Sequence, residues 1–184
     1  MKRAFDLAMS VLALLLLSPL LAVVSLVVFF DDGAPVVFKQ NRVGRGNELF
    51  KVYKFRTMRR ETKNTSQSAL RGEDCQTRTG KILRMLSLDE LPQLCNILMG
   101  QMSFVGPRPL IPEEDEIRQK RAEAGVYSVL PGLTGWAQVN GRANVSDEAK
   151  VALDTEYIEK QSFWLDMKIL VRTAWQVVTR RDAA

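Results

Sequence analysis

The stretch that decides the fold is Leu7–Phe30, LAMSVLALLLLSPLLAVVSLVVFF, a run of 24 residues without a charged side chain. As one continuous helix it would measure about 36 Å, which is long enough to cross the hydrocarbon core of a bilayer. A cleavable signal peptide fits poorly, because the apolar run is long and no small-x-small cleavage pattern follows it. The run therefore predicts a membrane segment, either a simple span or a hairpin that turns back.

Ser18-Pro19 interrupts this segment near its middle. Proline has no N–H and crowds the carbonyl one turn earlier, which costs about 3 kcal/mol in a regular helix interior. In hydrocarbon the freed carbonyl needs another partner, and a serine hydroxyl beside the break is one candidate. A helix-break-helix hairpin and a kinked span are both compatible with this pair.

Basic residues flank the apolar run on both sides. Lys2 and Arg3 precede it, and Lys39, Arg42 and Arg45 follow it within about 15 residues, the window that counts for orientation. Both flanks therefore have the character of cytoplasmic segments. A hairpin within one leaflet keeps them on the same side, whereas a span places one of them outside.

The remaining chain has the composition of one water-soluble domain. The 184 residues are 46% apolar and 26% charged, and there is no histidine, which excludes histidine-containing catalytic triads and the commonest metal ligand. Cys75 and Cys95 form no C-x-x-C pair, so we expect a reducing, cytoplasmic environment. The net charge of +5 suits an anionic partner, whether nucleic acid, acidic membrane or phosphorylated substrate.

Local patterns predict short strands and several helices. The expected elements are a turn at Asp31–Pro35, a hairpin of strands Pro35–Gly44 and Leu49–Phe55, a mobile polar loop at Arg59–Asp74, a helix around Glu113–Ala124, and two helices between Ser146 and about Arg180. The second of these begins near Ser162 and has a broad aromatic face. That face fits either packing against the core or a position at a membrane interface.

Ser87 predicts the clearest helix start of the chain. It is expected to be the N-cap, with Glu90 completing a capping box, Leu91, Leu94 and Leu98 forming an apolar stripe, and Gly100 ending the helix. Asp89 and Glu90 then lie in the first turn, where the helix dipole stabilises negative charge, so both should be ionised at pH 7. Capping alone is one explanation of this acidic pair, and catalysis is the other.

Nearby motifs supply cations for a phosphate. Gly106–Pro109 fixes Arg108 between two prolines, Pro131–Arg142 offers glycine-lined backbone, and Lys54, Arg56 and Arg84 add positive charge. Spacing alone does not bring these residues together, and a solvated basic surface is the alternative.

Several motifs in order resemble the bacterial sugar transferases, and more narrowly the small monotopic phosphoglycosyl transferases. The motifs, which lie between about Lys2 and Arg180, are Ser18-Pro19, Tyr53–Arg56, Ser87-Leu-Asp-Glu-Leu-Pro-Gln93, Met102–Pro109 and Pro131–Arg142. Leu130 and Cys75 depart from the pattern, since a basic residue is expected at each position. Neither touches the acidic pair.

The resemblance implies a fold and a reaction. The fold would be α+β and mostly helical, with a re-entrant membrane helix at residues 1–30, a small β-hairpin, and amphipathic interfacial helices around an active site in a cytoplasmic catalytic domain at residues 31–184. The enzyme would lie on the cytoplasmic face of the bacterial inner membrane. It would transfer a sugar 1-phosphate from a UDP-sugar to undecaprenyl phosphate and release UMP, which initiates glycoconjugate assembly. No nucleic-acid partner is expected.

The resemblance also assigns roles to residues. Asp89 would be the nucleophile and Glu90 its partner, and Mg²⁺ would bind at the diphosphate beside Asp89. The positions matched to phosphate or nucleotide handling are Lys54, Arg84, Arg108, Pro109 and Arg142. Attack by Asp89 would give an acyl-phosphate intermediate, and Glu90 would orient the acceptor, accept a proton or help hold the metal.

Three questions stay open at this point. A membrane-tethered basic adaptor without catalysis, and a one-step transferase in which Asp89 and Glu90 only bind metal, are the alternatives. The donor sugar is expected to be an N-acetylhexosamine type, such as UDP-diacetylbacillosamine or UDP-GlcNAc, although plain hexoses also fit. The oligomeric state does not follow from the sequence.

Overall fold

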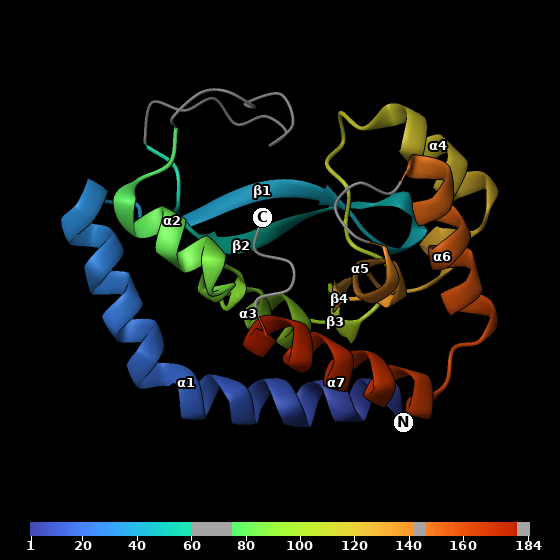
Figure 1. Cartoon of the computed structure of the whole chain (residues 1–184), viewed down its shortest axis with the longest axis horizontal. Helices are drawn as coiled ribbons and strands as arrows, with labels where there is room; N and C mark the ends of the chain where they lie inside the picture. The colour runs from blue at the N-terminus through green and yellow to red at the C-terminus, as the bar shows by residue number, and fades with distance from the viewer. Residues whose placement is uncertain (60–74, 142–145, 180–184) are drawn as a thin grey trace.

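The computed structural model describes residues 1–59, 75–141 and 146–179, which form a mostly helical molecule with two small sheets (Figure 1). The α+β, mostly helical prediction is confirmed, whereas the predicted loop at Arg59–Asp74 lies almost entirely outside the described residues. The elements are α1 (Lys2–Asp32), β1 (Val37–Val43), η1 (Arg45–Asn47), β2 (Leu49–Phe55), α2 (Arg78–Met85), η2 (Leu88–Glu90), α3 (Gln93–Leu98), β3 (Ser103–Val105), α4 (Asp115–Glu123), η3 (Val126–Ser128), β4 (Gly132–Thr134), α5 (Trp136–Asn140), α6 (Asp147–Glu159) and α7 (Phe163–Thr179).

The apolar segment forms α1, which bends sharply about halfway along its length (Figure 1). Pro19 lies inside this helix, and the helix continues through it, so the expected break is a bend within one helix. Pro19 cannot donate to the carbonyl of Leu15, and the Ser18 hydroxyl donates to that same carbonyl at 2.8 Å. The predicted role of the serine hydroxyl is thereby confirmed.

Polar contacts fasten the N-terminal end of α1 to the rest of the molecule. Lys2 pairs with Asp166 of α7 at 2.5 Å. Arg3 donates to the carbonyls of Ile97 and Leu98 at the C-terminal end of α3. Both basic residues therefore hold this end of α1 against two other helices.

Arg56 fastens the other end of α1. Its guanidinium is buried, pairs with Asp32 at 3.2 Å, and donates to the carbonyls of Asp32, Gly33 and Pro35. Gly33 has a φ of 74°, a left-handed conformation that glycine adopts without strain, and the chain turns there into β1. Arg56 is thus committed to structure, and it is not among the cations at the candidate site.

The two long strands pair as predicted. β1 and β2 are antiparallel, with Val37 opposite Phe55 and Val43 opposite Leu49, and η1 forms the turn between them. Val52 of β2 packs in a core cluster with Leu94 and Met102, and apolar residues of α1 cover this cluster. The hairpin therefore rests on α3 and α1 and presents its second strand to the candidate site.

β3 and β4 form a short parallel sheet that the sequence did not predict. Each strand has only three residues, too few for a recognisable alternation of apolar and polar side chains. A side chain at Gly132 would have its Cβ 2.1 Å from the amide nitrogen of Gly106. The glycines in these segments therefore allow two backbones to approach closely.

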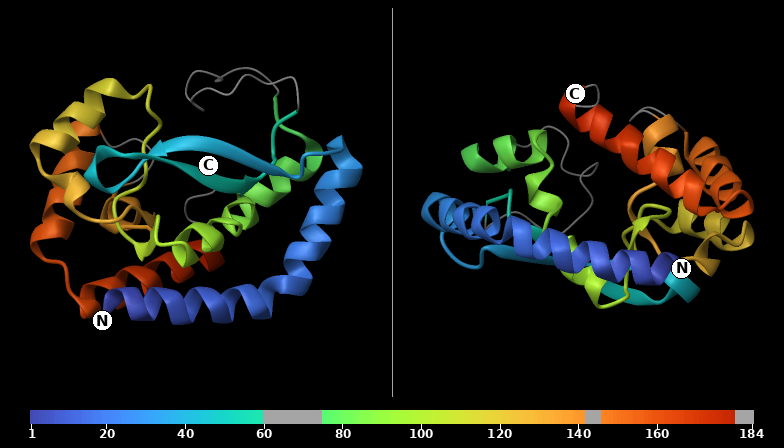
Figure 2. Two further views of the ribbon diagram at one scale, coloured as in Figure 1. Left: turned by 180° about the vertical axis from the view of Figure 1, so that it is seen from behind. Right: turned by 90° about the horizontal axis from the view of Figure 1, so that it is seen from below.

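The three later helices follow the predictions closely. α4 lies within the expected Glu113–Ala124 segment, and α6 and α7 occupy the expected C-terminal part. α7 and α1 converge where the Phe5 and Phe163 rings meet edge to face at 5.8 Å, and they spread apart from there (Figure 2). Between α6 and α7, the buried Tyr157 hydroxyl donates to Asp166 at 2.7 Å.

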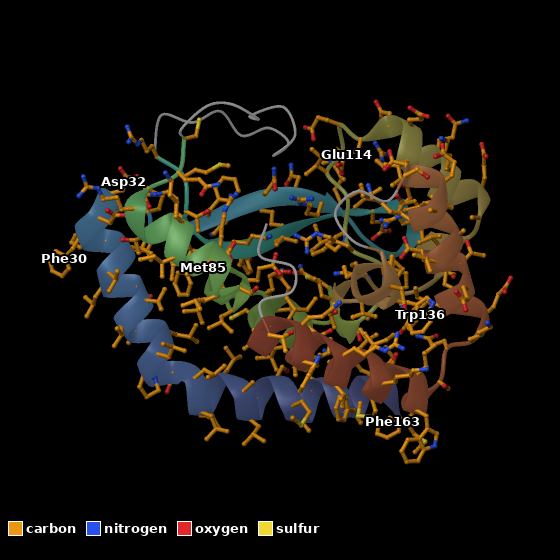
Figure 3. All side chains as sticks on the ribbon, in the orientation of Figure 1. Phe30, Asp32, Met85, Glu114, Trp136 and Phe163 are labelled. Carbon is orange, nitrogen blue, oxygen red and sulfur yellow. The ribbon has the colours of Figure 1, made fainter. Side chains whose placement is uncertain are left out.

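α7 has two different faces, so packing against the core is confirmed for one of them, and a position of the other at a membrane interface stays a prediction. Ile169 is fully buried in the core, whereas Trp164 is 80% exposed and Trp175 is 63% exposed. Apolar side chains also project outward along most of α1, as Figure 3 shows, where the labelled Phe30 points away from the body. By length and composition, α1 is long and apolar enough to cross a membrane.

Candidate functional site

The acidic pair lies in a tight joint between two helices. α2 ends at Met85, Ser87 adopts a left-handed conformation with φ 54°, and η2 carries Asp89 and Glu90 before α3 begins at Gln93. The predicted capping box is wrong, because the Ser87 side chain makes no capping hydrogen bond and Glu90 points elsewhere. The end of the helical segment near Gly100, which has a φ of 81°, is confirmed.

Glu90 is held between two cations. Its Oε1 accepts hydrogen bonds from Lys54 Nζ at 2.7 Å and from Arg108 Nη2 at 3.1 Å. Burial raises the pKa of Glu90, but the charges of Arg108 and Lys54 outweigh burial and bring the pKa to about 2. Glu90 is therefore ionised at pH 7, as predicted, and its charge is fully compensated.

Asp89 has the opposite environment. Its side chain is buried, and within the described ranges no lysine or arginine forms an ion pair with it. Burial, together with the neighbouring Glu90 charge, raises the pKa of Asp89. A helix N-terminus would stabilise the Asp89 carboxylate and lower its pKa. Because η2 is a single three-residue turn, this effect is smaller than those of burial and the Glu90 charge. Poor solvation leaves this carboxylate more basic and more reactive than an ordinary aspartate.

Three predicted cations converge on the pair. Lys54 and Arg108 contact Glu90, and the charges of Lys54 and Arg84 act to lower the pKa of Asp89. Arg84 Nε donates to the Thr57 hydroxyl at 2.8 Å, while its Nη1 is buried without a hydrogen-bond partner among the residues that the structure describes. Arg84 thus retains an unused donor beside Asp89.

The other positions singled out in the sequence are Arg142, Pro109 and Cys75. Arg142 lies outside the described residues, so its placement is not known. Pro109 contributes backbone, since its carbonyl accepts from Arg42 Nη1 at 3.1 Å. The flagged Cys75 precedes α2 and is not disulfide-bonded to Cys95.

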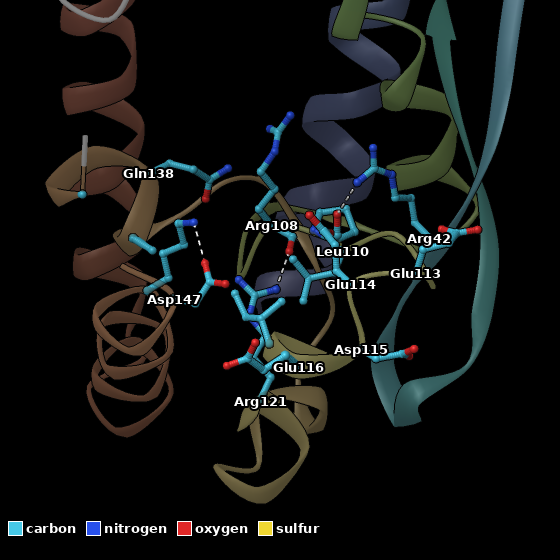
Figure 4. Close-up of a pocket in the computed structure, with 15 residues that line it drawn as sticks. Arg42, Arg108, Leu110, Glu113, Glu114, Asp115, Glu116, Arg121, Gln138 and Asp147 are labelled. Atoms are coloured by element: carbon cyan, nitrogen blue, oxygen red, sulfur yellow. Dashed lines mark hydrogen bonds and ion pairs between the residues drawn. The ribbon is translucent and has the colours of Figure 1, made fainter. Parts of the chain in front are cut away.

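A cavity of about 670 Å³ opens beside Arg108 (Figure 4). Arg108 and Pro109 form part of its wall, and β1, α4, α5 and α6 contribute the rest. Its remaining lining residues are Arg42, Leu110, Glu113, Glu114, Asp115, Glu116, Ile117, Arg121, Ala137, Gln138, Gly141, Asp147 and Lys150. The volume lies in the usual range for small-molecule sites. Sequence reasoning missed this cavity because its walls come from separate segments.

Two buried residues near this cavity were also missed. Arg121 of α4 and Asp154 of α6 form an ion pair at 2.5 Å, and Arg121 donates to the Arg108 carbonyl at 2.7 Å. Both side chains are almost fully buried. In the sequence they lie among exposed charges of helices, and no local signal distinguishes them.

The acidic pair fits a magnesium ion only if a substrate completes the site. Among the described residues, no group of three or more Asp, Glu, Cys or His side chains could hold a metal. Mg²⁺ is commonly bound by one or two carboxylates together with substrate phosphates and water. Asp89, a carboxylate free of ion pairs among the described residues, matches that donor set, whereas Glu90 is already engaged by two cations.

Comparisons with known proteins identify the family of this chain. Residues 1–180 match the family model described as bacterial sugar transferase. The chain is 43% identical over 99% of its length to the undecaprenyl-phosphate glucose phosphotransferase of Komagataeibacter xylinus, and 40% identical over its full length to the UDP-glucose:undecaprenyl-phosphate glucose-1-phosphate transferase of Escherichia coli. It covers only 36% and 41% of those two proteins.

A third relative has nearly the same extent. The uncharacterized sugar transferase EpsL of Bacillus subtilis is 43% identical over 97% of this chain, which covers 87% of that protein. The matched region therefore contains the membrane helix, the acidic pair and the surrounding cations together. The chain belongs to the bacterial sugar transferase family.

Proposed function

We propose that the chain transfers a sugar 1-phosphate from a UDP-sugar to undecaprenyl phosphate, releases UMP, and does so through a covalent intermediate on Asp89. The observation that carries the proposal is the contrast within the acidic pair. Glu90 is neutralised by Lys54 and Arg108, whereas Asp89 is buried with a raised pKa and no ion pair among the described residues. This contrast suits a mechanism in which the Asp89 carboxylate attacks the substrate and Glu90 holds the neighbouring cations in place.

The first step makes one bond and breaks one. A carboxylate oxygen of Asp89 attacks the phosphorus that carries the sugar, and the phosphorus–oxygen bond to UMP breaks, so that UMP leaves with the electron pair. Asp89 then carries the sugar phosphate as an acyl phosphate. Arg84 and Arg108 are placed to offset the negative charge of the diphosphate, which would otherwise repel the carboxylate.

The second step restores the enzyme. An oxygen of the undecaprenyl phosphate attacks the same phosphorus, and the bond to Asp89 breaks, which frees the carboxylate. This acceptor oxygen is already anionic near pH 7, so it needs orientation more than a strong base. Glu90 holds Lys54 and Arg108 in place for both steps.

Mg²⁺ is proposed as the cofactor, with Asp89 as its protein ligand. When bound, it would neutralise charge on the phosphate oxygens of the donor. The ion pairs of Glu90 leave it less suited to ligation than Asp89.

The membrane arrangement is proposed to be monotopic, on the cytoplasmic face. Lys2 and Arg3 fasten one end of α1 to α7 and α3, and Arg56 fastens the other end beside β1. A helix whose two ends bind the same polar body enters and leaves the bilayer on one side. This placement brings the site to the level of a lipid phosphate.

The donor is proposed to be a UDP-sugar of the N-acetylhexosamine or hexose class. The names of two relatives specify glucose, whereas the sequence analysis favours an N-acetylhexosamine. Measuring UMP release across UDP-glucose, UDP-galactose, UDP-GlcNAc, UDP-GalNAc and UDP-diacetylbacillosamine decides between these sugar classes.

The covalent step is tested without the lipid acceptor. The full chain in nanodiscs is incubated with Mg²⁺ and each UDP-sugar, and intact-protein mass spectrometry is expected to find one added sugar phosphate, which Asp89→Asn abolishes together with turnover. UMP release that requires undecaprenyl phosphate and never gives an adduct would favour the one-step transferase. No UMP release with any donor would favour the non-catalytic adaptor.

A further inference from the structure

We infer that Arg42 and Arg121 are positioning residues, which hold the carbonyls of Arg108 and Pro109 so that the Arg108 guanidinium faces Glu90. The inference rests on the proposed function, because it assigns these two arginines to the same site. Neither side chain forms an ion pair with the acidic pair in the part of the chain that the structure describes.

Four successive carbonyls around Arg108 are all engaged. The acceptor–donor pairs are Pro107 O with Gly132 N at 2.9 Å, Arg108 O with Arg121 Nη1 at 2.7 Å, Pro109 O with Arg42 Nη1 at 3.1 Å, and Leu110 O with Val43 N at 2.9 Å. The donors come from three separate elements, β4, α4 and β1, and β1 is far from the other two in sequence. Figure 4 shows the two arginine contacts from opposite sides of this loop.

Arg108 itself needs such support. Its side chain is 49% exposed, so packing alone does not hold it 3.1 Å from Glu90. The prolines on either side restrict backbone rotation, and the engaged carbonyls fix the orientation of the peptide planes. The direction of the side chain is therefore set by its backbone.

Arg121 connects this loop to α6. One guanidinium nitrogen donates to the Arg108 carbonyl, and the other pairs with the buried Asp154 at 2.5 Å. A buried ion pair contributes little net stability compared with well-packed apolar side chains. An arginine fits here because its fork serves a carboxylate and a carbonyl at once.

Arg42 supports the next residue from the hairpin. Its two terminal nitrogens bind different acceptors, the Pro109 carbonyl at 3.1 Å and Gln40 Oε1 at 2.7 Å. A lysine at this position keeps the positive charge but loses the fork. Arg42→Lys therefore separates positioning from simple charge.

The test measures UMP release by Arg42→Lys, by Asp154→Asn, and by the double variant Arg121→Gln/Asp154→Asn, each in nanodiscs. Asp154→Asn removes the ion pair but keeps Arg121, so it reports the structural effect of losing the pair. Arg118→Gln is the matched control, since Arg118 also donates to a carbonyl of this loop, that of Pro112 at 2.6 Å, but farther from Arg108. Melting temperatures confirm that each variant is folded.

Arg42→Lys is expected to lower kcat by about 10- to 100-fold relative to wild type, the size of effect that misplacement of a reacting group produces. The double variant is expected to lower kcat by a similar factor relative to Asp154→Asn. Arg118→Gln is expected to keep kcat within about twofold of wild type, because Arg118 binds the carbonyl of Pro112 and not that of Arg108 or Pro109. The decisive measurement repeats the substitutions in an Arg108→Ala background. There they are expected to have no further effect, because a positioning residue has nothing left to position.

Equal losses in the wild-type and Arg108→Ala backgrounds would overturn the inference, and so would full activity of Arg42→Lys. If the double variant does not fold, Arg42→Lys alone still decides the outcome. Absence of UMP release by the wild-type protein would instead refute the proposed function. The two failures are therefore distinguishable.

Discussion

Two adjacent carboxylates, Asp89 and Glu90, experience opposite electrostatic environments. The environment of Glu90 lowers its pKa to about 2, whereas burial and the Glu90 charge raise the pKa of Asp89. One consequence is a conflict between stability and reactivity. A buried carboxylate without an ion pair destabilises the fold, and removing it should relieve that cost.

Asp89→Asn is accordingly expected to raise the free energy of unfolding by about 0.5–1 kcal/mol at pH 7 while abolishing turnover. Glu90→Gln should lower it by about 1–2 kcal/mol, because Lys54 and Arg108 lose their anionic partner. Thermal unfolding in nanodiscs measures both.

Since the folded-state pKa of Glu90 is depressed, its stabilisation is complete above about pH 4.3, its ordinary value, and is lost as pH falls toward 2. The difference between wild type and Glu90→Gln should shrink over that range.

The pH profile of catalysis is expected to report Asp89. The attacking carboxylate must be ionised, so kcat/KM should fall as the pH drops through its pKa, which lies above the ordinary aspartate value of about 4. The charge of Arg84 acts to lower this pKa, so Arg84→Gln should move the acid limb to higher pH. Kinetics between pH 4.5 and 8 test this, and an unmoved limb in Arg84→Gln would assign it to another group.

At the scale of single elements, α2 carries Arg84 and is fixed by one close approach. A Cβ at Gly80 would lie 2.1 Å from the carbonyl oxygen of Thr57, at the end of the segment that follows β2. This backbone contact fixes the position of α2 relative to Thr57, and Arg84, one turn farther along the helix, then reaches the Thr57 hydroxyl. A glycine is required because nothing larger fits.

Gly80→Ala is therefore expected to lower the free energy of unfolding by about 2 kcal/mol or more, because backbone cannot move aside as a flexible side chain does. Turnover should also fall, since Arg84 shifts with the helix. Arg78→Ala, an exposed change in the first turn of α2, is the control and should change stability by less than about 0.5 kcal/mol. Similar melting curves for the two variants would contradict this account.

At the scale of the whole molecule, exposed apolar residues of α1 and α7 form the surface that we propose contacts the membrane. α7 presents Trp164, Val171 and Trp175 outward, and these positions share one helical face. Trp136 has a different environment, because its indole N–H donates to Glu156 and its ring contacts Arg172. The three tryptophans therefore sample two environments.

Variants that retain a single tryptophan, with phenylalanine at the other two positions, test this arrangement. In bilayers of brominated lipid, fluorescence of Trp164 and of Trp175 should be quenched, and fluorescence of Trp136 should be much less affected. Equal quenching of all three would place the membrane elsewhere on the molecule.

The path of α1 is tested with one cysteine near its start and one in the turn of the β1–β2 hairpin that follows its end. In a background without Cys75 and Cys95, Ala4→Cys and Glu48→Cys should react with a membrane-impermeant maleimide from the same side of sealed vesicles. The reason is that ion pairs at both ends bind α1 to one polar body. Labelling from opposite sides would establish a span and remove the monotopic arrangement.

The sequence by itself determined the local features of this protein. The apolar run with Ser18-Pro19, the hairpin ending at Phe55 and the C-terminal helices follow from short-range patterns, and the motifs led to the family. The predicted capping box failed because Ser87 has a left-handed backbone conformation and the Glu90 side chain binds Lys54 and Arg108, which are distant in sequence.

Tertiary structure decided everything that depends on which charges meet. It assigned Arg56 to the end of α1, gave Glu90 two cations and left Asp89 without an ion pair among the described residues, and paired Arg121 with Asp154 beneath Arg108. The physical reason is that burial and charge neutralisation arise between elements, from residues tens of positions apart. The periodicity of a sequence shows which face of a helix is apolar. It does not show which distant carbonyl or carboxylate an arginine of that helix will contact.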